Sequence, residues 1–171
     1  MTSYLTCAVC NKGIGWETSG DGLKRINCDL KECQPNIAII HFGVADYKKG
    51  IIVKEIFKNL SRIIEICKKK DVRVILFGFK LPELSHLRDE LYSLTSALNI
   101  KVNNDFFDMY KELANLHQID FFPDFYEGIL GEKGMMIEND GHLTAKGYSV
   151  FVDNILPTVI KNIDIVFARR F

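Results

Sequence analysis

Apolar residues along the chain follow two alternating patterns. Nearly continuous apolar runs occupy residues 36–42 and 72–79, whereas the stretch between them, 51–69, has apolar side chains every three or four positions. Short continuous runs are typical of strands covered on both faces, and the longer spacing is typical of helices. This order predicts an α/β fold of three layers, in which an open, mostly parallel sheet has helices on both faces.

The same patterns predict the remaining elements. Strands are expected at 5–10 and 119–122, and helices at 19–32, 84–98 and 106–116, with a last helix that is capped by Thr144 and runs toward residue 160. At 171 residues the chain has the length of one domain. We therefore expect residues 1–171 to form a single domain, with its functional residues at the carboxyl ends of the strands.

Composition narrows the class of partner. Apolar residues make up 47% of the chain and charged residues 26%, with 22 basic and 22 acidic side chains, which argues against disorder and against a nucleic-acid partner. No apolar run approaches the roughly 20 residues of a membrane span, and Thr6, Asn11 and Lys12 interrupt the one stretch that could resemble a signal peptide. We expect a cytoplasmic protein, and the composition leaves its oligomeric state open.

The five cysteines indicate free thiols in a reducing compartment, because their number is odd and Cys67 lies in a lysine-rich helical stretch. An alternative is a zinc site built from Cys7, Cys10, Cys28 and Cys33. Against it, the first two lie in a predicted strand, where residues three apart point to opposite faces. A redox pair at the same two positions would lack the helix N-terminus that usually lowers a thiol pKa. We therefore expect no metal and no other cofactor.

The candidate chemistry lies before the last helix, in the segment Asn-Asp-Gly-His at residues 139–142. Asp140 beside His142 could fix the imidazole tautomer and stabilise its protonated form, as a general base requires. The alternative is an ordinary turn, in which the histidine only satisfies a backbone group at the helix start. Three other histidines, His41, His86 and His117, lack a metal-ligand spacing partner, and His41 is interpreted as a satisfied polar residue at a strand end.

Four segments together resemble the SGNH or GDSL hydrolases, in particular the bacterial thioesterase I/lysophospholipase L1 branch. The segment around His142 is similar to that family's last block, and residues 11–23 to its N-x-x-x-S-G-[DE]-T-S-x-x-G-L block. Residues 41–46, His-Phe-Gly-Val-Ala-Asp, are similar to E-L-G-G-N-D, and Leu81-Pro82 to R-L-P. The resemblance implies a flavodoxin-like SGNH fold, an acyl-ester or lipid substrate, and His142 with Asp140 as catalytic residues.

The chain departs from this pattern at the positions that carry the chemistry. No Gly-Asp-Ser block occurs in it, Ser3 follows no apolar strand, and Ser19 matches a serine that begins a helix and is not the nucleophile. The resemblance implies an oxyanion hole made of a backbone N–H at a glycine and the side-chain amide of an asparagine. These two positions read Trp16 and Ala45 here, and the loss of one such donor typically costs ~3 kcal/mol of transition-state stabilisation. The usual D-x-x-H spacing would also place Asn139 at the carboxylate position, so Asp140 needs a loop one residue shorter.

Two functions stay open on these grounds. One is an ester hydrolase of the esterase, lysophospholipase or thioesterase kind, incomplete or catalytically impaired; the other is a non-catalytic SGNH-like binding domain. The family's first strand would lie between the strands expected at 5–10 and 36–42, so either the sequence is part of a longer chain, the two strands have closed up, or another chain supplies a strand. Aromatic residues could line an acyl groove, although core packing is favoured, and these are Phe106, Phe107, Tyr110, Phe121, Phe122, Phe125 and Tyr126.

Overall fold

The computed structural model describes residues 7–78, 102–137 and 142–168. Three parallel strands form its sheet in the order β1 (Ile37–Ile40), β2 (Arg73–Phe77) and β3 (Asp120–Phe122). The helices are α1 (Ser19–Cys33), α2 (Val44–Lys48), α3 (Val53–Lys69), α5 (Val102–His117) and α6 (Ala145–Ala168). These bounds confirm the expected helices and strands from residue 19 onward wherever the structure describes them, whereas the helix expected at 84–98 lies outside the described residues.

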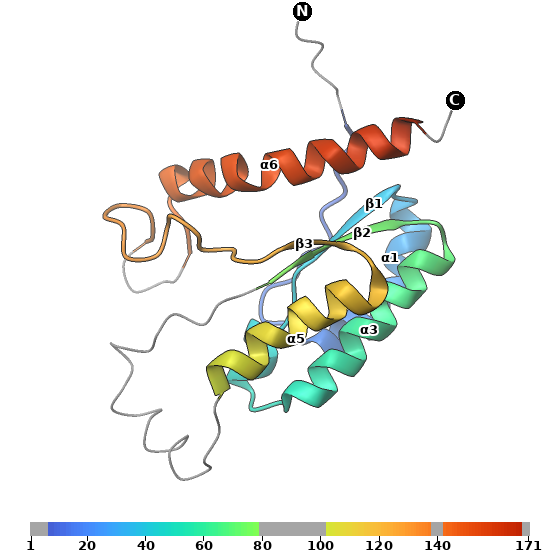
Figure 1. The fold of residues 1–171 in the computed structure, drawn as a ribbon, viewed down its shortest axis with the longest axis horizontal. Coiled ribbons are helices and arrows are strands. Elements are labelled where there is room, and N and C mark those ends of the chain that lie inside the picture. The colour runs from blue at the N-terminus through green and yellow to red at the C-terminus, as the bar shows by residue number, and fades with distance from the viewer. Residues whose placement is uncertain (1–6, 79–101, 138–141, 169–171) are drawn as a thin grey trace, which may run out of the picture.

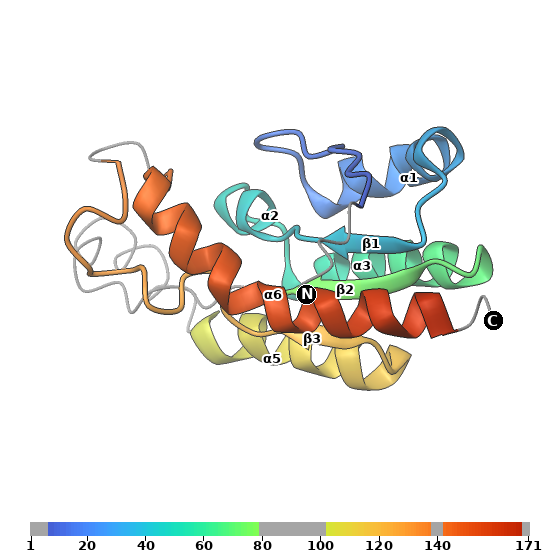
Figure 2. The same cartoon turned by 90° about the horizontal axis from the view of Figure 1, so that it is seen from above.

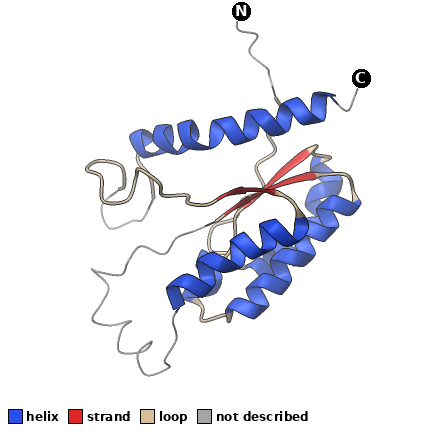
Figure 3. Cartoon of the chain, in the orientation of Figure 1, coloured by secondary structure: helices blue, strands red, loops and turns tan. Residues whose placement is uncertain are grey.

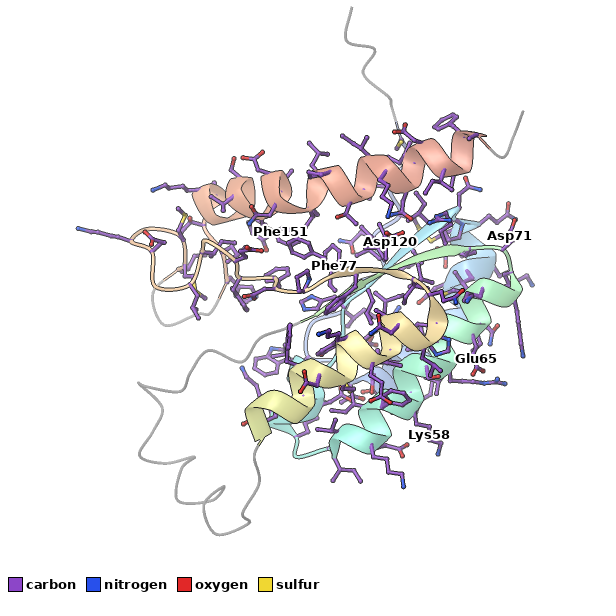
Figure 4. The ribbon with its side chains drawn as sticks, viewed as in Figure 1. Lys58, Glu65, Asp71, Phe77, Asp120 and Phe151 are labelled. Carbon is purple, nitrogen blue, oxygen red and sulfur yellow. A yellow bond between two sulfur atoms is a disulfide. The ribbon has the colours of Figure 1, made fainter. Side chains whose placement is uncertain are left out.

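The sheet lies between two layers of helices (Figures 1 and 3). On one face α1, α3 and α5 pack against Ile40, Val74 and Leu76. On the other face Phe151, Ile155 and Val159 of α6 pack against Ile75, Phe77 and Phe122, and Figure 4 shows Phe77 and Phe151 facing each other. Successive residues of β2 therefore point into opposite cores, which explains why its sequence is continuously apolar. The predicted three-layer α/β fold is confirmed.

The first predicted strand is wrong for the residues that the structure describes. Residues 7–10 have no strand structure, and β1 lies at an edge of the described sheet, where Ile39 is 46% exposed. An apolar run forms a strand only if a neighbouring strand pairs with its backbone, and no described strand lies beside 7–10. The alternative in which the two strands have closed up is therefore excluded for these residues.

The N-terminal segment instead lies along α1. Cys10 forms a disulfide with Cys33 at the end of that helix, and Lys12 forms an ion pair with Glu32 at 2.7 Å. The expectation of free thiols is thus wrong for this pair, while Cys7, Cys28 and Cys67 are free. The N-terminal segment is long enough to make this contact. A 15-residue helix is about 22 Å long, and the nine residues from Cys10 to Ser19 span up to about 30 Å, so the segment can return to the far end of α1.

Two helices differ from the sequence prediction, one in its existence and one in its length. Helix α2 was not predicted, because its five residues show no helical apolar period. Helix α6 continues to Ala168 through Pro157, beyond the expected end near residue 160. No helix in the described part of the chain is both long enough and apolar enough to cross a bilayer.

Candidate active site

The carboxyl ends of the parallel strands meet at one end of the molecule, which is where open α/β sheets bind their ligands. Figure 2 shows α2, which follows β1, and the first turn of α6 beyond this end of the sheet. Trp16 lies shortly before α1, Ala45 lies in the first turn of α2, and His142 lies just before α6. The described segments that carry the predicted site residues therefore lie at one end of the fold.

A buried polar network joins the start of α1 to α2. Asp46 and Ser19 are both fully buried, and the Asp46 carboxylate accepts hydrogen bonds from the Ser19 backbone N–H at 2.8 Å and from its hydroxyl at 2.5 Å. Asn59 of α3 donates to the Ser19 hydroxyl at 3.2 Å. The carboxylate thus satisfies donors at the helix start, a position where negative charge is also favoured by the helix dipole. Ser19 begins a helix, as predicted, and its buried hydroxyl is already engaged.

The turn between β1 and α2 is held by a close approach that only glycine allows. Gly43 has a φ of 124°, and a Cβ at this position would clash with the Tyr110 hydroxyl oxygen. That hydroxyl donates a hydrogen bond to the Phe42 carbonyl at 2.7 Å. Burial, together with the nearby Asp46 charge, raises the pKa of Tyr110 and keeps the phenol protonated. The turn that leads into Ala45 is therefore rigidly positioned.

Trp16 lies on the turn before α1, in contact with the end of α2. Its side chain is 69% exposed, and the Lys48 ammonium lies 4.6 Å from the centre of its ring, a cation–π geometry. The Lys49 ammonium donates to the Trp16 carbonyl at 3.1 Å. The backbone φ of Trp16 is 65°, in the left-handed region that favours glycine. A bulky residue therefore occupies a backbone conformation suited to glycine, which is the residue that the resemblance implies here.

Ala45 lies in the first turn of α2 and is 8% exposed. The resemblance implies a side-chain amide at this position. The methyl group of Ala45 cannot donate a hydrogen bond in its place. The neighbouring Asp46 carboxylate is directed at Ser19, as the two short hydrogen bonds show. The Asp46 carboxylate therefore holds the turn, and the side chain before it offers no hydrogen-bond donor.

The segment that carries His142 is exposed but anchored on both sides. The His142 carbonyl accepts a hydrogen bond from the Ile137 backbone N–H at 2.8 Å, and Leu143 next to it is buried. Thr144 caps α6 as predicted, because its hydroxyl accepts from the Gly147 backbone N–H at 3.2 Å. A Cβ at position 147 would clash with the Met135 carbonyl, which explains the glycine there. Asp140 and Asn139 lie outside the described residues.

His41 differs from its sequence interpretation. Its ring lies at the carboxyl end of β1, stacked on Phe125 with the ring centres 4.9 Å apart. The buried Nε2 atom has no hydrogen-bond partner among the described residues, so the expectation of a satisfied polar residue is wrong for this atom. Burial lowers the pKa of His41 to about 4, so the ring is neutral at physiological pH. No local sequence pattern indicates this burial, because the surrounding rings come from β2 and from the segment after β3.

The other candidate groups either make contacts that support the fold or lie outside the described residues. His117 Nε2 and the Ser61 hydroxyl are hydrogen bonded at 2.8 Å, which links α5 to α3, and burial lowers the pKa of His117. His86, Ser3, Leu81 and Pro82 lie outside the described residues. No group of three or more metal-binding side chains occurs in the described ranges. Phe106, Tyr110 and Phe122 are core residues, as the favoured interpretation of the aromatic residues predicted.

A parallel sheet between two helix layers places the chain in the class of three-layer α/β domains. The chain belongs to the GDSL-like lipase/acylhydrolase family, whose pattern its sequence matches over residues 3–150. It is 24% identical over 155 residues to an arylesterase from Vibrio mimicus, covering 91% of this chain and 71% of that protein. It is also 24% identical over 151 residues to esterase TesA from Pseudomonas aeruginosa, covering 88% and 69%.

Solved structures share the fold of this chain. The TesA crystal structure superposes with a TM-score of 0.71 at 23% identity, covering 85% of this chain and 74% of that one. The psychrotrophic esterase EstA from Pseudoalteromonas gives a TM-score of 0.74 at 18% identity, with 91% and 78% covered. AlinE4, an SGNH-hydrolase family esterase, gives a TM-score of 0.63 at 25% identity, with 88% and 74% covered. The resemblance predicted from the four sequence segments is confirmed.

Proposed function

We propose that this chain is an ester hydrolase-type domain whose turnover of acyl esters is strongly impaired. Ala45 is the observation that carries the proposal, because a buried methyl group stands where an amide would donate to the developing oxyanion. The loss of one such donor typically lowers the rate about 10²-fold to 10³-fold. The relatives' names, arylesterase and esterase, support an acyl ester as the substrate class.

In this proposal His142 acts as a general base on a water molecule, with Asp140 as the carboxylate that orients it. The position supports the role, because an exposed histidine before α6 is accessible to solvent and substrate. Water then attacks the ester carbonyl, the imidazole takes the proton, and the alcohol leaves with that proton. General-base catalysis of this kind contributes about 10²-fold to 10⁴-fold, well below what a nucleophile and a complete oxyanion hole supply together.

The test is hydrolysis of p-nitrophenyl acetate and p-nitrophenyl octanoate by the 171-residue chain. We expect slow turnover above buffer that His142→Ala abolishes and that Lys146→Ala, a change of an exposed residue on α6, leaves unchanged. The variant Ala45→Asn should raise the rate about tenfold or more, because it restores a donor. A rate near the ordinary enzyme value of about 10 s⁻¹ would contradict the impairment. A background rate that His142→Ala does not change would instead support the non-catalytic binding domain.

A further inference from the structure

Two neighbouring loops at the carboxyl end of the sheet expose large apolar side chains beside lysines. Trp16, on the turn before α1, is 69% exposed, and Ile52, between α2 and α3, is 68% exposed. The Lys48 ammonium lies over the Trp16 ring, and the Lys49 ammonium donates to the Trp16 carbonyl. Figure 2 shows the segment before α1 beside α2. We call Trp16, Lys48, Lys49, Ile52 and the exposed Lys54 of α3 the Trp16 patch.

The Trp16 patch is compact because the chain turns sharply after α2. The Lys49 backbone N–H donates to the Ala45 carbonyl at 3.0 Å, and the Ile51 backbone N–H donates to the Asp46 carbonyl at 3.0 Å. Ile52 follows Lys49 by three residues, so their Cα atoms are at most about 11 Å apart. Lysine side chains on this turn also contact Trp16 directly. The residues of the patch therefore share one small region of the surface.

Folding alone explains neither apolar residue of the patch. Trp16 has a φ of 65°, a backbone conformation that is unfavourable for a bulky residue. Ile52 is the N-cap of α3, where a polar side chain would accept a hydrogen bond from the helix and isoleucine makes none. Both side chains are mostly exposed, so neither gains much from packing. Residues that break a local rule without a gain in packing are expected at functional surfaces.

The charge of the patch is positive, because the neighbouring carboxylates are engaged elsewhere. Glu17 forms an ion pair with Arg25 at 2.6 Å. The Asp46 carboxylate is buried against Ser19, and Glu55 lies 3.9 Å from an ammonium group on the next turn of α3. In the described ranges no carboxylate is ion paired with a lysine of the patch. The whole chain has 22 basic and 22 acidic side chains, so this positive charge is a local feature.

We propose that the Trp16 patch docks the chain on the surface of a bilayer that contains anionic phospholipids. Tryptophan is enriched at the membrane–water interface, where its ring lies at the level of the headgroups. Each lysine near an anionic bilayer raises the affinity about fivefold. A bilayer needs only apolar side chains flanked by cations, whereas a protein partner needs a surface of matching shape. The patch offers the first combination, and docking requires no ester turnover.

Trp16 is the single tryptophan of the chain, so its fluorescence reports on the patch directly. The full chain is titrated with phosphatidylcholine vesicles that contain about 30% phosphatidylglycerol, and with pure phosphatidylcholine vesicles. We expect the anionic vesicles to shift the emission to shorter wavelength. Affinity for pure phosphatidylcholine should be at least about tenfold lower, because the attraction of three lysines is lost. Salt at about 0.5 M should weaken binding to the anionic vesicles by screening.

Two variants separate docking from folding. In vesicle co-sedimentation, Ile52→Ser should lower the affinity about fivefold or more, because an apolar side chain no longer enters the interface. Lys54→Glu should lower it at least about tenfold. Thermal stability should stay equal or rise in both, because serine is a better N-cap and a carboxylate suits the first turn of α3. The matched controls Leu116→Ser and Lys70→Glu change exposed residues just before β3 and β2, at the other end of the strands, and should bind like the starting chain.

Several outcomes would overturn the proposal. These are equal affinity for neutral and anionic vesicles, binding to neither, or unchanged Trp16 emission in the vesicle-bound chain. Binding that both Ile52→Ser and Lys54→Glu leave intact would also contradict it. An emission shift with poly-glutamate and not with vesicles would replace the bilayer by an acidic protein, and a shift with glycerol phosphate alone would replace it by a soluble anion. None of these readouts measures hydrolysis, so docking and the proposed function can fail separately.

Discussion

Two parts of the candidate site differ in how they are held. Around the start of α1 and α2, Ser19, Asp46 and Asn59 form a buried network, and Tyr110 closes over Gly43. The segment of His142 is exposed and is held by backbone and capping contacts on either side of that residue. The first part positions the turn, whereas the second carries His142, the proposed general base.

Stability constrains the buried network around Asp46 more strongly than it constrains position 45. Loss of Asp46 would leave buried donors unsatisfied, so the fold itself requires this carboxylate. Loss of an amide at position 45 leaves only a small apolar side chain, which a packed turn accommodates easily. The fold can therefore stay intact with alanine at the position where the resemblance implies an amide, and Trp16 can stay at a turn that contacts Lys48 and Lys49.

Removal of the buried carboxylate tests this difference most strongly. We expect Asp46→Ala to lower the free energy of unfolding by about 3–5 kcal/mol, because two charge-assisted hydrogen bonds to Ser19 are lost and their donors stay buried. Asp46→Asn should cost less, because one acceptor oxygen remains. Urea denaturation measures both, with Asp108→Ala on α5 as an exposed control. A cost below 1 kcal/mol for Asp46→Ala would show that the network does not hold this end of the fold.

The Gly43 turn should be nearly as sensitive. Gly43→Ala combines a positive φ with a clash against the Tyr110 hydroxyl, so we expect a loss of about 2–4 kcal/mol in the free energy of unfolding. Gly50 is the matched control, because its φ is also positive, at 69°, and a Cβ there meets open space. Gly50→Ala should cost only about 1 kcal/mol. Equal costs for the two variants, measured by thermal or urea unfolding, would contradict the role of the Tyr110 contact.

His41 predicts a pH dependence of stability. Its folded-state pKa of about 4 lies below the unfolded value of about 6.5, so between these values the unfolded chain binds more protons. The stability contribution of the neutral ring is therefore present above about pH 6.5 and is lost as the pH falls toward 4, by up to about 3 kcal/mol. His41→Phe keeps the stacking on Phe125 and should remove this component. Parallel curves for the two proteins between pH 7 and 4 would contradict the assignment.

The capping contact beside His142 should matter least. Thr144→Val removes the hydroxyl that caps α6 but keeps the side-chain shape, so we expect a loss of about 1 kcal/mol in stability. Thermal unfolding measures the change, and Ser149→Ala, at an exposed position in the same helix, should stay within about 0.5 kcal/mol of the starting protein. A loss as large as that of Asp46→Ala would remove the contrast between the two parts of the site.

Local patterns predicted most of the fold. Strands β1, β2 and β3 and helices α1, α3, α5 and α6 follow apolar periods that tertiary packing left unchanged, and the Thr144 cap follows a local hydrogen-bond rule. The strand expected at 5–10 is not formed at residues 7–10, because strand formation depends on a neighbouring strand, which a local pattern does not contain. The disulfide between Cys10 and Cys33 was missed for a related reason, since it depends on the path of the chain along α1.

The site was predicted in part. Resemblance located Trp16, Ala45 and His142 at segments that the structure places at the same end of the sheet (Figure 2). The sequence did not reveal the hydrogen bonds from Ser19 to Asp46, which join residues 27 positions apart, although both residues lie in matched blocks. Among the described residues His41 Nε2 has no hydrogen-bond partner, and its ring contacts, Phe77 and Phe125, are distant in sequence, so no local signal could have found this.

Labelling by a serine-reactive probe distinguishes a hydrolase fold with the proposed impaired oxyanion site from a working serine esterase. The 171-residue chain is incubated with a fluorophosphonate probe, and labelling is read by mass spectrometry beside the rate of p-nitrophenyl acetate hydrolysis. We predict no labelled serine and a slow, His142-dependent rate. A stoichiometrically labelled serine with fast turnover that His142→Ala abolishes would contradict the account.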